Sequence, residues 1–233
     1  MPIPYLQHEL FEPNRQLSVG KRIIENIGEA VVIDNFFSFA DDISEFLETS
    51  WVPSWKNNDK SKNYVDYYDC RIDIPQGPAE FSNQHDYQNI VKDLALSKLG
   101  YKCHSEIRPT SFNIFKWINP PESNSIQSYP HQDGTDMLAA VVYLDKKCDG
   151  GTAFYSTVDE VDYEEDEDIR FDVGKYAKLE DVVEANFNRC VIYPGHYFHG
   201  AYIDNHSSYT HDTWRKTMVM FFPTMRFYND NTF

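Results

Sequence analysis

Two residues in the run Tyr129–Gly134 have the types and the spacing of a metal site. His131 and Asp133 are separated by a single residue. Residues i and i+2 of an extended strand point to the same face. An imidazole nitrogen and a carboxylate oxygen arranged in this way can bind one metal ion from a rigid edge. The pair alone is a weak signal, so its meaning depends on whether the chain supplies a further ligand.

The candidates for a third ligand are four histidines near the C-terminal end of the sequence: His196, His199, His206 and His211. Residues 191–193 favour a buried strand, and the Pro-Gly pair that follows ends it. His199 comes soon after this turn, whereas His206 and His211 lie in a polar stretch that reads as a loop. Two histidines and one carboxylate leave coordination positions open, and this ligand set is typical of non-heme Fe(II) oxygenases.

An arginine begins the last apolar run of the chain. Arg215 directly precedes residues 216–222, which favour a strand. A buried arginine needs an anionic partner, and its planar guanidinium suits the two oxygens of a carboxylate. A carboxylate-bearing cofactor would supply that partner, although an ordinary salt bridge at the end of a strand is an alternative.

This order of residues, from His131-x-Asp133 through His199 to Arg215, resembles the 2-oxoglutarate- and Fe(II)-dependent dioxygenases, in particular their prolyl-hydroxylase-like branch. The resemblance covers about residues 30–228. It implies that His131, Asp133 and His199 bind Fe(II).

The resemblance also implies a place for the cofactor. Arg215 would pair with the distal carboxylate of 2-oxoglutarate, and the hydroxyl of Tyr143 would bind the same group; packing in the core is the alternative for Tyr143. Fe(II) and 2-oxoglutarate are therefore the expected cofactors, with ascorbate as an accessory reductant. The expected reaction is hydroxylation of an aliphatic carbon with release of succinate and CO₂. Related halogenases replace the carboxylate of the triad with a small residue, so Asp133 favours hydroxylation.

The substrate is not specified by the sequence. An amino acid, a peptide, a protein side chain or a small metabolite all remain open. Substrate loops vary within the resembled superfamily, and Lys56–Asp69 and Asp159–Lys178 are the segments expected to contact the substrate. A different class of function also remains open, namely a catalytically silent β-sandwich that serves as a binding module.

Charge excludes one class of partner and suggests another. The net charge is −16, and nucleic-acid binding needs a basic surface, so nucleic acid is excluded as a partner. Much of the charge lies in the acidic run Asp159–Asp168. This run reads either as a solvated loop or as a lid that attracts a cationic substrate by electrostatic steering.

Other features of the sequence bear on location. No stretch approaches the roughly 18 apolar residues of a membrane span, and residues 1–5 lack the basic start and apolar segment of a signal peptide. The cysteines are Cys70, Cys103, Cys148 and Cys190, with no Cys-x-x-Cys pair, so structural zinc is not expected. We therefore expect a cytoplasmic protein with reduced thiols and no membrane partner. The oligomeric state is not determined.

Periodicity predicts helices first and strands afterwards. A helix is expected over 85–99, ending at Gly100, and strands over 105–118, 137–145, 151–156, 188–193 and 215–222. The resemblance implies an opening strand over 30–38 and a helix over 39–51 before them. This order favours a mainly β sandwich with flanking α-helices, compatible with a jelly-roll or cupin-like core. The resemblance implies the double-stranded β-helix topology itself. We expect one domain over 1–233, with a helical and irregular part over 1–104 and the metal-binding β-core over 105–228.

Overall fold

The computed structural model describes residues 8–49, 67–74, 86–105, 110–117, 130–157, 177–210 and 213–225. The strands are β1 (Ser18–Ile24), β2 (Gly28–Asp34), β3 (Tyr67–Ile74), β4 (Thr110–Trp117), β5 (Met137–Tyr143), β6 (Gly151–Thr157), β7 (Ala177–Glu184), β8 (Cys190–Pro194), β9 (Phe198–Tyr202) and β10 (Arg215–Pro223). The helices are α1 (Ala40–Thr49) and α2 (Asp86–Leu94), with short helical turns at His8–Phe11, Ala95–Leu99 and His206–Tyr209.

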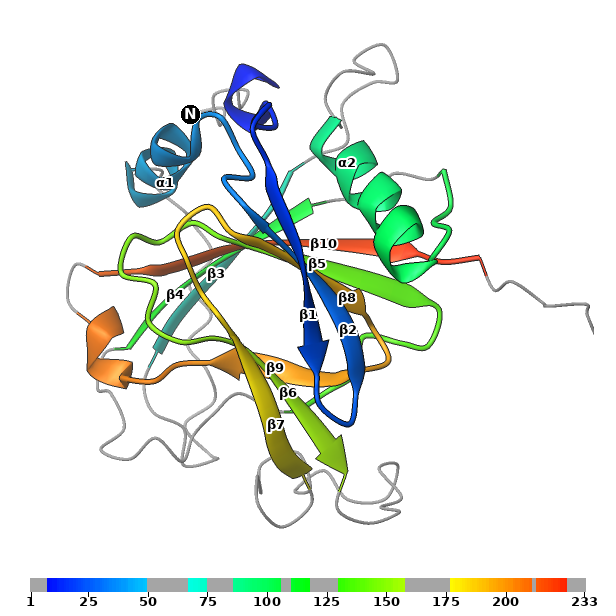
Figure 1. The fold of residues 1–233 in the computed structure, drawn as a ribbon. Coiled ribbons are helices and arrows are strands. Elements are labelled where there is room, and N and C mark those ends of the chain that lie inside the picture. The colour runs from blue at the N-terminus through cyan, green and yellow to red at the C-terminus, as the bar shows by residue number, and fades with distance from the viewer. Residues whose placement is uncertain are drawn as a thin grey trace, which may run out of the picture.

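The strands form two antiparallel sheets. The large sheet has seven strands in the order β1-β2-β8-β5-β10-β4-β3, and the small sheet has three in the order β7-β6-β9. An isolated bridge between His131 and His199 adds one more strand position to the small sheet, beside β9. In Figure 1 the helices α1 and α2 lie above the large sheet, and the small sheet lies below it.

The path of the chain between the two sheets defines the fold. After β5 in the large sheet, β6 and β7 pair in the small sheet; β8 then returns to the large sheet, β9 to the small one and β10 to the large one. Repeated crossing between two facing antiparallel sheets is the jelly-roll arrangement. The fold class expected from the sequence, a double-stranded β-helix with flanking helices, is therefore confirmed.

Alternation along β5 separates two cores. Leu138, Ala140 and Val142 belong to the cluster that α1 and α2 cover, together with Met218 and Phe222 of β10. The residues between them on β5 face the small sheet, where Ala139, Val141 and Tyr143 join Phe154, Val191 and Tyr193. Successive strand residues point to opposite faces, so a strand apolar on both faces, as β5 is, must be central.

The helices match the sequence expectations. Both carry acidic residues in the first turn, Asp41 and Asp42 in α1 and Asp86 in α2, where they interact favourably with the helix dipole. The turn after α2 ends at Gly100, which has φ of 78° and donates its N–H to the carbonyls of Ala95 and Leu96. A left-handed residue of this kind is most often glycine.

The strands expected over 137–145, 151–156 and 215–222 are present as β5, β6 and β10. The strand expected from 188 begins only at Cys190, because Asn188 has a positive φ of 65°. The part of the chain before residue 105 was expected to be helical and irregular. It also contains three strands, β1, β2 and β3, which extend the large sheet. The division into a single domain over 1–233 stays a prediction.

None of the helices in the described part of the chain has the length and apolar character needed to cross a lipid bilayer. Three cysteines in that part, Cys103, Cys148 and Cys190, are free thiols. Burial is the main cause that raises the pKa of all three thiols. The pKa of Cys148 rises to about 12, because the Asp145 carboxylate adds to the effect of burial. All three are therefore protonated and unreactive at neutral pH.

Candidate metal centre

His131, Asp133 and His199 meet at one point in the structure. One ligand atom from each lies within 4.8 Å of the others. The Nε2 of His131 is 3.6 Å from Oδ1 of Asp133, and the Nε2 of His199 is 3.2 Å from Oδ2. In the part of the chain that the structure describes, no other group of His, Cys, Asp or Glu side chains gathers in this way.

Backbone pairing sets the two histidines side by side. His131 N donates to the carbonyl of His199 at 2.9 Å, and His199 N donates back to the carbonyl of His131 at 3.0 Å. Directly opposite residues of an antiparallel pair have their side chains on the same face. The two imidazole rings accordingly lie with their centroids 4.5 Å apart.

Asp133 is placed differently from the way its spacing suggested. Only His131 takes part in a strand pairing, and residues 132–134 are not in a strand. Instead, Asp133 N donates to the carbonyl of Gly195 at 2.8 Å, and the side-chain amide of Gln132 donates to the carbonyl of His196 at 2.6 Å. The carboxylate is thus held by the turn that follows β8.

Gly195 makes this contact possible. A Cβ atom at this position would lie 3.0 Å from the carbonyl oxygen of Gly134 and 3.0 Å from Met137. The Pro-Gly turn that predicted a strand end therefore also allows two backbone segments to approach each other closely. That approach brings the residues after β8 against the loop that carries Asp133.

The ring of His199 is oriented by its own chain. Its Nδ1 lies 2.9 Å from the carbonyl oxygen of Tyr197. A carbonyl can only accept, so Nδ1 donates this hydrogen bond, and Nε2 is the nitrogen that faces Asp133. Histidines that bind metals usually donate their second nitrogen in this manner. The ring is buried, with 6% of the side chain exposed.

The three side chains differ in access to solvent. The side chain of Asp133 is 13% exposed, and that of His131 is 51% exposed. One side of the site is therefore closed by the sandwich and the other is open. This asymmetry suits a site that must hold a metal ion rigidly and still admit a small molecule.

The alternative histidines lie elsewhere. His196 is half-buried in the turn, where its ring packs against Tyr197 at 4.9 Å. His206 is buried in the short helix before β10, and burial lowers its pKa. Neither belongs to the group of ligand atoms described above. His211 lies outside the described residues.

Arg215 and Tyr143 face the space between the sheets. Tyr143 of β5 pairs with Thr217 of β10, and Arg215 is on the same face of β10 as Thr217. Burial raises the pKa of Tyr143 to about 12; its hydrogen bond with Thr152 and the charge of Arg215 act in the opposite direction. The hydroxyl of Tyr143 lies 2.5 Å from Oγ1 of Thr152 on the small sheet.

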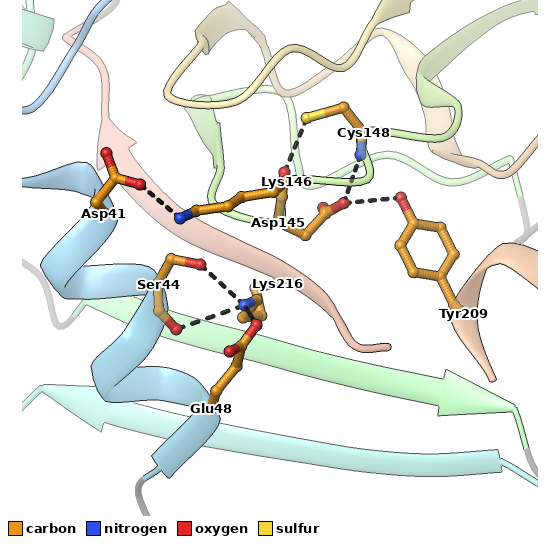
Figure 2. Close-up of polar contacts among 8 residues, drawn as sticks. All are labelled: Asp41, Ser44, Glu48, Asp145, Lys146, Cys148, Tyr209 and Lys216. Carbon is orange, nitrogen blue, oxygen red and sulfur yellow. Dashed lines mark hydrogen bonds and ion pairs between the residues drawn. The ribbon is translucent and has the colours of Figure 1, made fainter. Parts of the chain in front are cut away.

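Arg215 is half-buried and makes no ion pair with any carboxylate among the described residues. The neighbouring Lys216 points to the opposite face of β10. There its Nζ donates to Oγ of Ser44 at 2.8 Å and pairs with Glu48 of α1 (Figure 2). A guanidinium on the interior face has the geometry to pair with an anionic ligand through two parallel hydrogen bonds.

The segment after β5 is held by a second network, also drawn in Figure 2. Oδ1 of Asp145 accepts from the backbone N of Cys148 at 2.7 Å and from the hydroxyl of Tyr209 at 3.0 Å. The tyrosine hydroxyl in turn accepts from the backbone N of Asp149 at 2.8 Å. These bonds tie the β5–β6 loop to the short helix before β10, and so steady the ends of the strands that carry Tyr143 and Arg215.

Three contributors to the site were not identified in the sequence analysis. Tyr193 packs on the ring of His199 with centroids 4.6 Å apart, Tyr197 orients the same ring through its carbonyl, and Thr152 binds Tyr143. Strand alternation in residues 190–194 would have placed Tyr193 on the same face as Val191, and this was the one available clue. The carbonyl of Tyr197 and the side chain of Thr152 could not be recognised from the spacing of residues in the sequence.

No family model matches the sequence, and no curated protein matches it. Solved structures with a similar fold include AviO1 from Streptomyces viridochromogenes, with 12% identity, a TM-score of 0.44 and coverage of 93% of this chain and 92% of that one. HygX from Streptomyces hygroscopicus, solved with nickel and 2-oxoglutarate bound, has 12% identity, a TM-score of 0.45 and coverage of 83% and 82%. A Pseudomonas putida prolyl-4-hydroxylase has 15% identity, a TM-score of 0.39 and coverage of 80% and 83%. The fold assignment above rests on the strand order of this chain, not on these likenesses.

Proposed function

We propose that this protein is a 2-oxoglutarate- and Fe(II)-dependent oxygenase. The observation that carries the proposal is the meeting of His131, Asp133 and His199 at one point of a jelly roll. Two imidazole nitrogens and one carboxylate form a facial ligand set that leaves positions open on a six-coordinate ion, and this set is characteristic of non-heme Fe(II) oxygenases.

The donor set fits the proposed metal. Nε2 of His199 and Nε2 of His131 both lie close to the carboxylate of Asp133. Imidazole suits iron, and a carboxylate adds one negative charge that favours a divalent cation. In this proposal His131, Asp133 and His199 hold Fe(II), and the hydrogen bond from Nδ1 of His199 to Tyr197 fixes the ring.

The interior residues fit the proposed co-substrate. Arg215 would pair with the distal carboxylate of 2-oxoglutarate through two parallel hydrogen bonds. Tyr143, kept protonated by its burial, would donate to the same group. The buried cluster around Tyr143 and Phe154 would exclude bulk water. When bound, the metal and 2-oxoglutarate supply the oxidising power, with succinate and CO₂ as by-products.

Hydroxylation of an aliphatic carbon is the reaction we propose. Asp133 occupies the position where a halogenase would need an open site for chloride.

We propose an amino-acid, peptide or small-molecule substrate, cationic if the acidic run 159–168 steers it, and no nucleic acid or membrane as a partner. The structure does not describe residues 56–66 or 159–176. These ranges include the acidic run and most of the two segments expected to contact the substrate. The free thiols support our proposal of a cytoplasmic location.

The decisive experiment is anaerobic addition of Fe(II) and 2-oxoglutarate to the purified protein. A keto acid that chelates ferrous iron produces a weak visible charge-transfer band, so we expect this band to appear. Exposure to oxygen, with ascorbate to keep iron reduced, should then form succinate slowly even without substrate. Absence of the band from folded protein in excess iron would contradict the proposal.

A catalytically silent binding module is the alternative from another class. An intact set of His131, Asp133 and His199 beside an unpaired Arg215 argues against it, because a decayed site usually loses at least one of these residues. Succinate formation separates the two functions: a silent module would bind partners without converting 2-oxoglutarate.

A further inference from the structure

We infer that Tyr193 is a further ligand-binding residue of this site, whose hydroxyl donates a hydrogen bond to the 2-oxo acid between the metal ligands and Arg215. The inference rests on the proposed function and adds to it a residue that touches the co-substrate. Nothing in the spacing of the metal ligands or of Arg215 requires a tyrosine here.

The position of Tyr193 points its ring into the space between the sheets. Tyr193 lies on β8, where its partner on β5 is the small residue Ala139. It belongs to the same buried cluster as Tyr143 and Phe154. Its own exposure is 2%.

The ring is held from two sides. It lies against His199 with centroids 4.6 Å apart, and it meets the ring of Phe154 edge-on at 5.2 Å. Such aromatic contacts restrict a side chain to one orientation. Tyr193 is thus a rigid neighbour of a proposed metal ligand, as a group that positions a ligand must be.

The hydroxyl has no hydrogen-bond partner among the described residues, unlike that of Tyr143, which bonds Thr152. Oη of Tyr193 is not among the fully buried side-chain atoms that lack a partner, so it borders accessible space at the site. A bound ligand with anionic oxygens can accept its hydrogen bond there.

The contacts of Tyr193 place it between the two ends of the proposed binding site. Its ring lies against His199, one of the proposed metal ligands. It also shares a buried cluster with Tyr143, whose strand pairs with the strand that carries Arg215. A molecule that spans these two ends therefore passes Tyr193.

The test is the variant Tyr193→Phe, which keeps the ring contacts and removes only the hydroxyl. Tyr155→Phe is the matched control, because Tyr155 is also buried but packs with Ala153 and Ala177 in a separate cluster on the small sheet. Titration of the anaerobic Fe(II) proteins with 2-oxoglutarate, followed by the visible band, should show a Kd raised about tenfold or more in Tyr193→Phe. The control should match the wild type, and calorimetry should show the same Fe(II) affinity in all three.

An unchanged 2-oxoglutarate Kd in folded Tyr193→Phe overturns the inference while leaving the proposed function standing. An equal loss of Fe(II) affinity also overturns it, because Tyr193 would then act by supporting His199. If the wild type itself binds Fe(II) but not 2-oxoglutarate, the proposed function fails and the inference fails with it. Comparison of melting temperatures shows whether each variant is folded.

Discussion

The ring of His199 has little freedom to move in the structure. The ring is buried, Nδ1 is bound to the carbonyl of Tyr197, and the ring packs against Tyr193. A ligand held in this way loses almost no conformational entropy when it binds a metal. The half-buried His196 on the adjoining turn has no comparable restraint on its nitrogens among the described residues.

We therefore expect His199→Ala to abolish Fe(II) binding and 2-oxoglutarate turnover, and His196→Ala, His206→Ala and His211→Ala to retain both. Loss of one of three protein ligands removes both affinity and the facial geometry. Iron content after anaerobic loading and desalting measures the effect. Full iron occupancy in His199→Ala, with loss in one of the other variants, would show that the triad has been assigned wrongly.

The second prediction at this scale concerns Arg215. Arg215→Lys keeps the charge but loses the two-pronged geometry, so 2-oxoglutarate binding should weaken by roughly 1.5–3 kcal/mol. Fe(II) affinity should not change, because Arg215 is not among the metal ligands. The Kd from anaerobic titration checks the prediction. An unaltered Kd for 2-oxoglutarate would mean that Arg215 is structural.

At the scale of elements, the hairpin between β1 and β2 contacts Tyr197, the residue whose carbonyl orients His199. The backbone N of Glu29 donates to the hydroxyl of Tyr197 at 3.3 Å, and the carbonyl of Tyr197 holds His199. Gly28 has φ of 151°, and a Cβ atom there would overlap the Tyr197 hydroxyl. The hairpin thus fits against the turn that orients a proposed ligand.

Gly28→Ala should displace the Tyr197 ring and lower Fe(II) affinity by about tenfold, in the range found for residues that orient metal ligands. Gly20→Ala on the same hairpin is the control, since the nearest atom to its added Cβ is the Val32 carbonyl oxygen at 4.0 Å. Calorimetric titration with Fe(II) compares the two. Equal affinity in Gly28→Ala and Gly20→Ala would show that the hairpin does not influence the site.

The attachment of α1 to β10 gives a prediction about stability. Lys216 is almost fully buried, and its Nζ bonds Ser44 and Glu48 of α1, whereas the ion pair of Lys146 with Asp41 is exposed (Figure 2). Removing Glu48 leaves a buried ammonium with only Ser44 as its partner. Removing the lysine leaves a carboxylate that is 54% exposed and can be solvated.

Glu48→Ala should therefore destabilise the protein by about 1–3 kcal/mol. Lys216→Met, which replaces the buried ion with an apolar chain of similar length, should cost at most about 1 kcal/mol. Lys146→Met at the exposed pair should change stability by about 0.5 kcal/mol or less. Urea unfolding measures all three, and a larger loss in Lys216→Met than in Glu48→Ala would contradict this account.

At the scale of the whole molecule, the proposed metal centre joins separate parts of the chain. His131 and Asp133 precede β5, while His199 lies on β9 in the other sheet. An ion bound here connects residues about 70 positions apart, and it binds the folded state in preference to the unfolded one. Metal binding should therefore raise the stability of the entire fold.

With metal and 2-oxoglutarate each at about 100 times its Kd, the gain should be at least about 2.7 kcal/mol. For a chain of this size that corresponds to roughly 5–10 °C in Tm. Mn²⁺ with 2-oxoglutarate under scanning calorimetry measures the shift without redox chemistry. EDTA should reverse it, and Asp133→Ala should not show it; a shift of the same size in Asp133→Ala would place the metal elsewhere.

Two of the strands that the sequence predicted consist of side chains that require burial on both faces. Residues 137–143 and 190–194 are almost entirely buried, so their apolar runs identified them. β1 is exposed along most of its length, β7 is half polar, and β9 contains a glycine and His199. These strands have no pattern of their own, because pairing with distant neighbours decides their conformation.

The sequence by itself determined the residue types of the site and their order along the chain. The site is recognisable from local patterns: His131-x-Asp133, the histidine after a Pro-Gly turn, and the arginine at the start of the last strand. Patterns of this kind can be read from the sequence without knowledge of the fold. Only the tertiary structure decided that Asp133 is held by Gly195, that His199 is oriented by Tyr197, and that Tyr193 and Thr152 face the interior. These contacts join segments that meet because two sheets face each other, and no spacing within one segment encodes such a meeting.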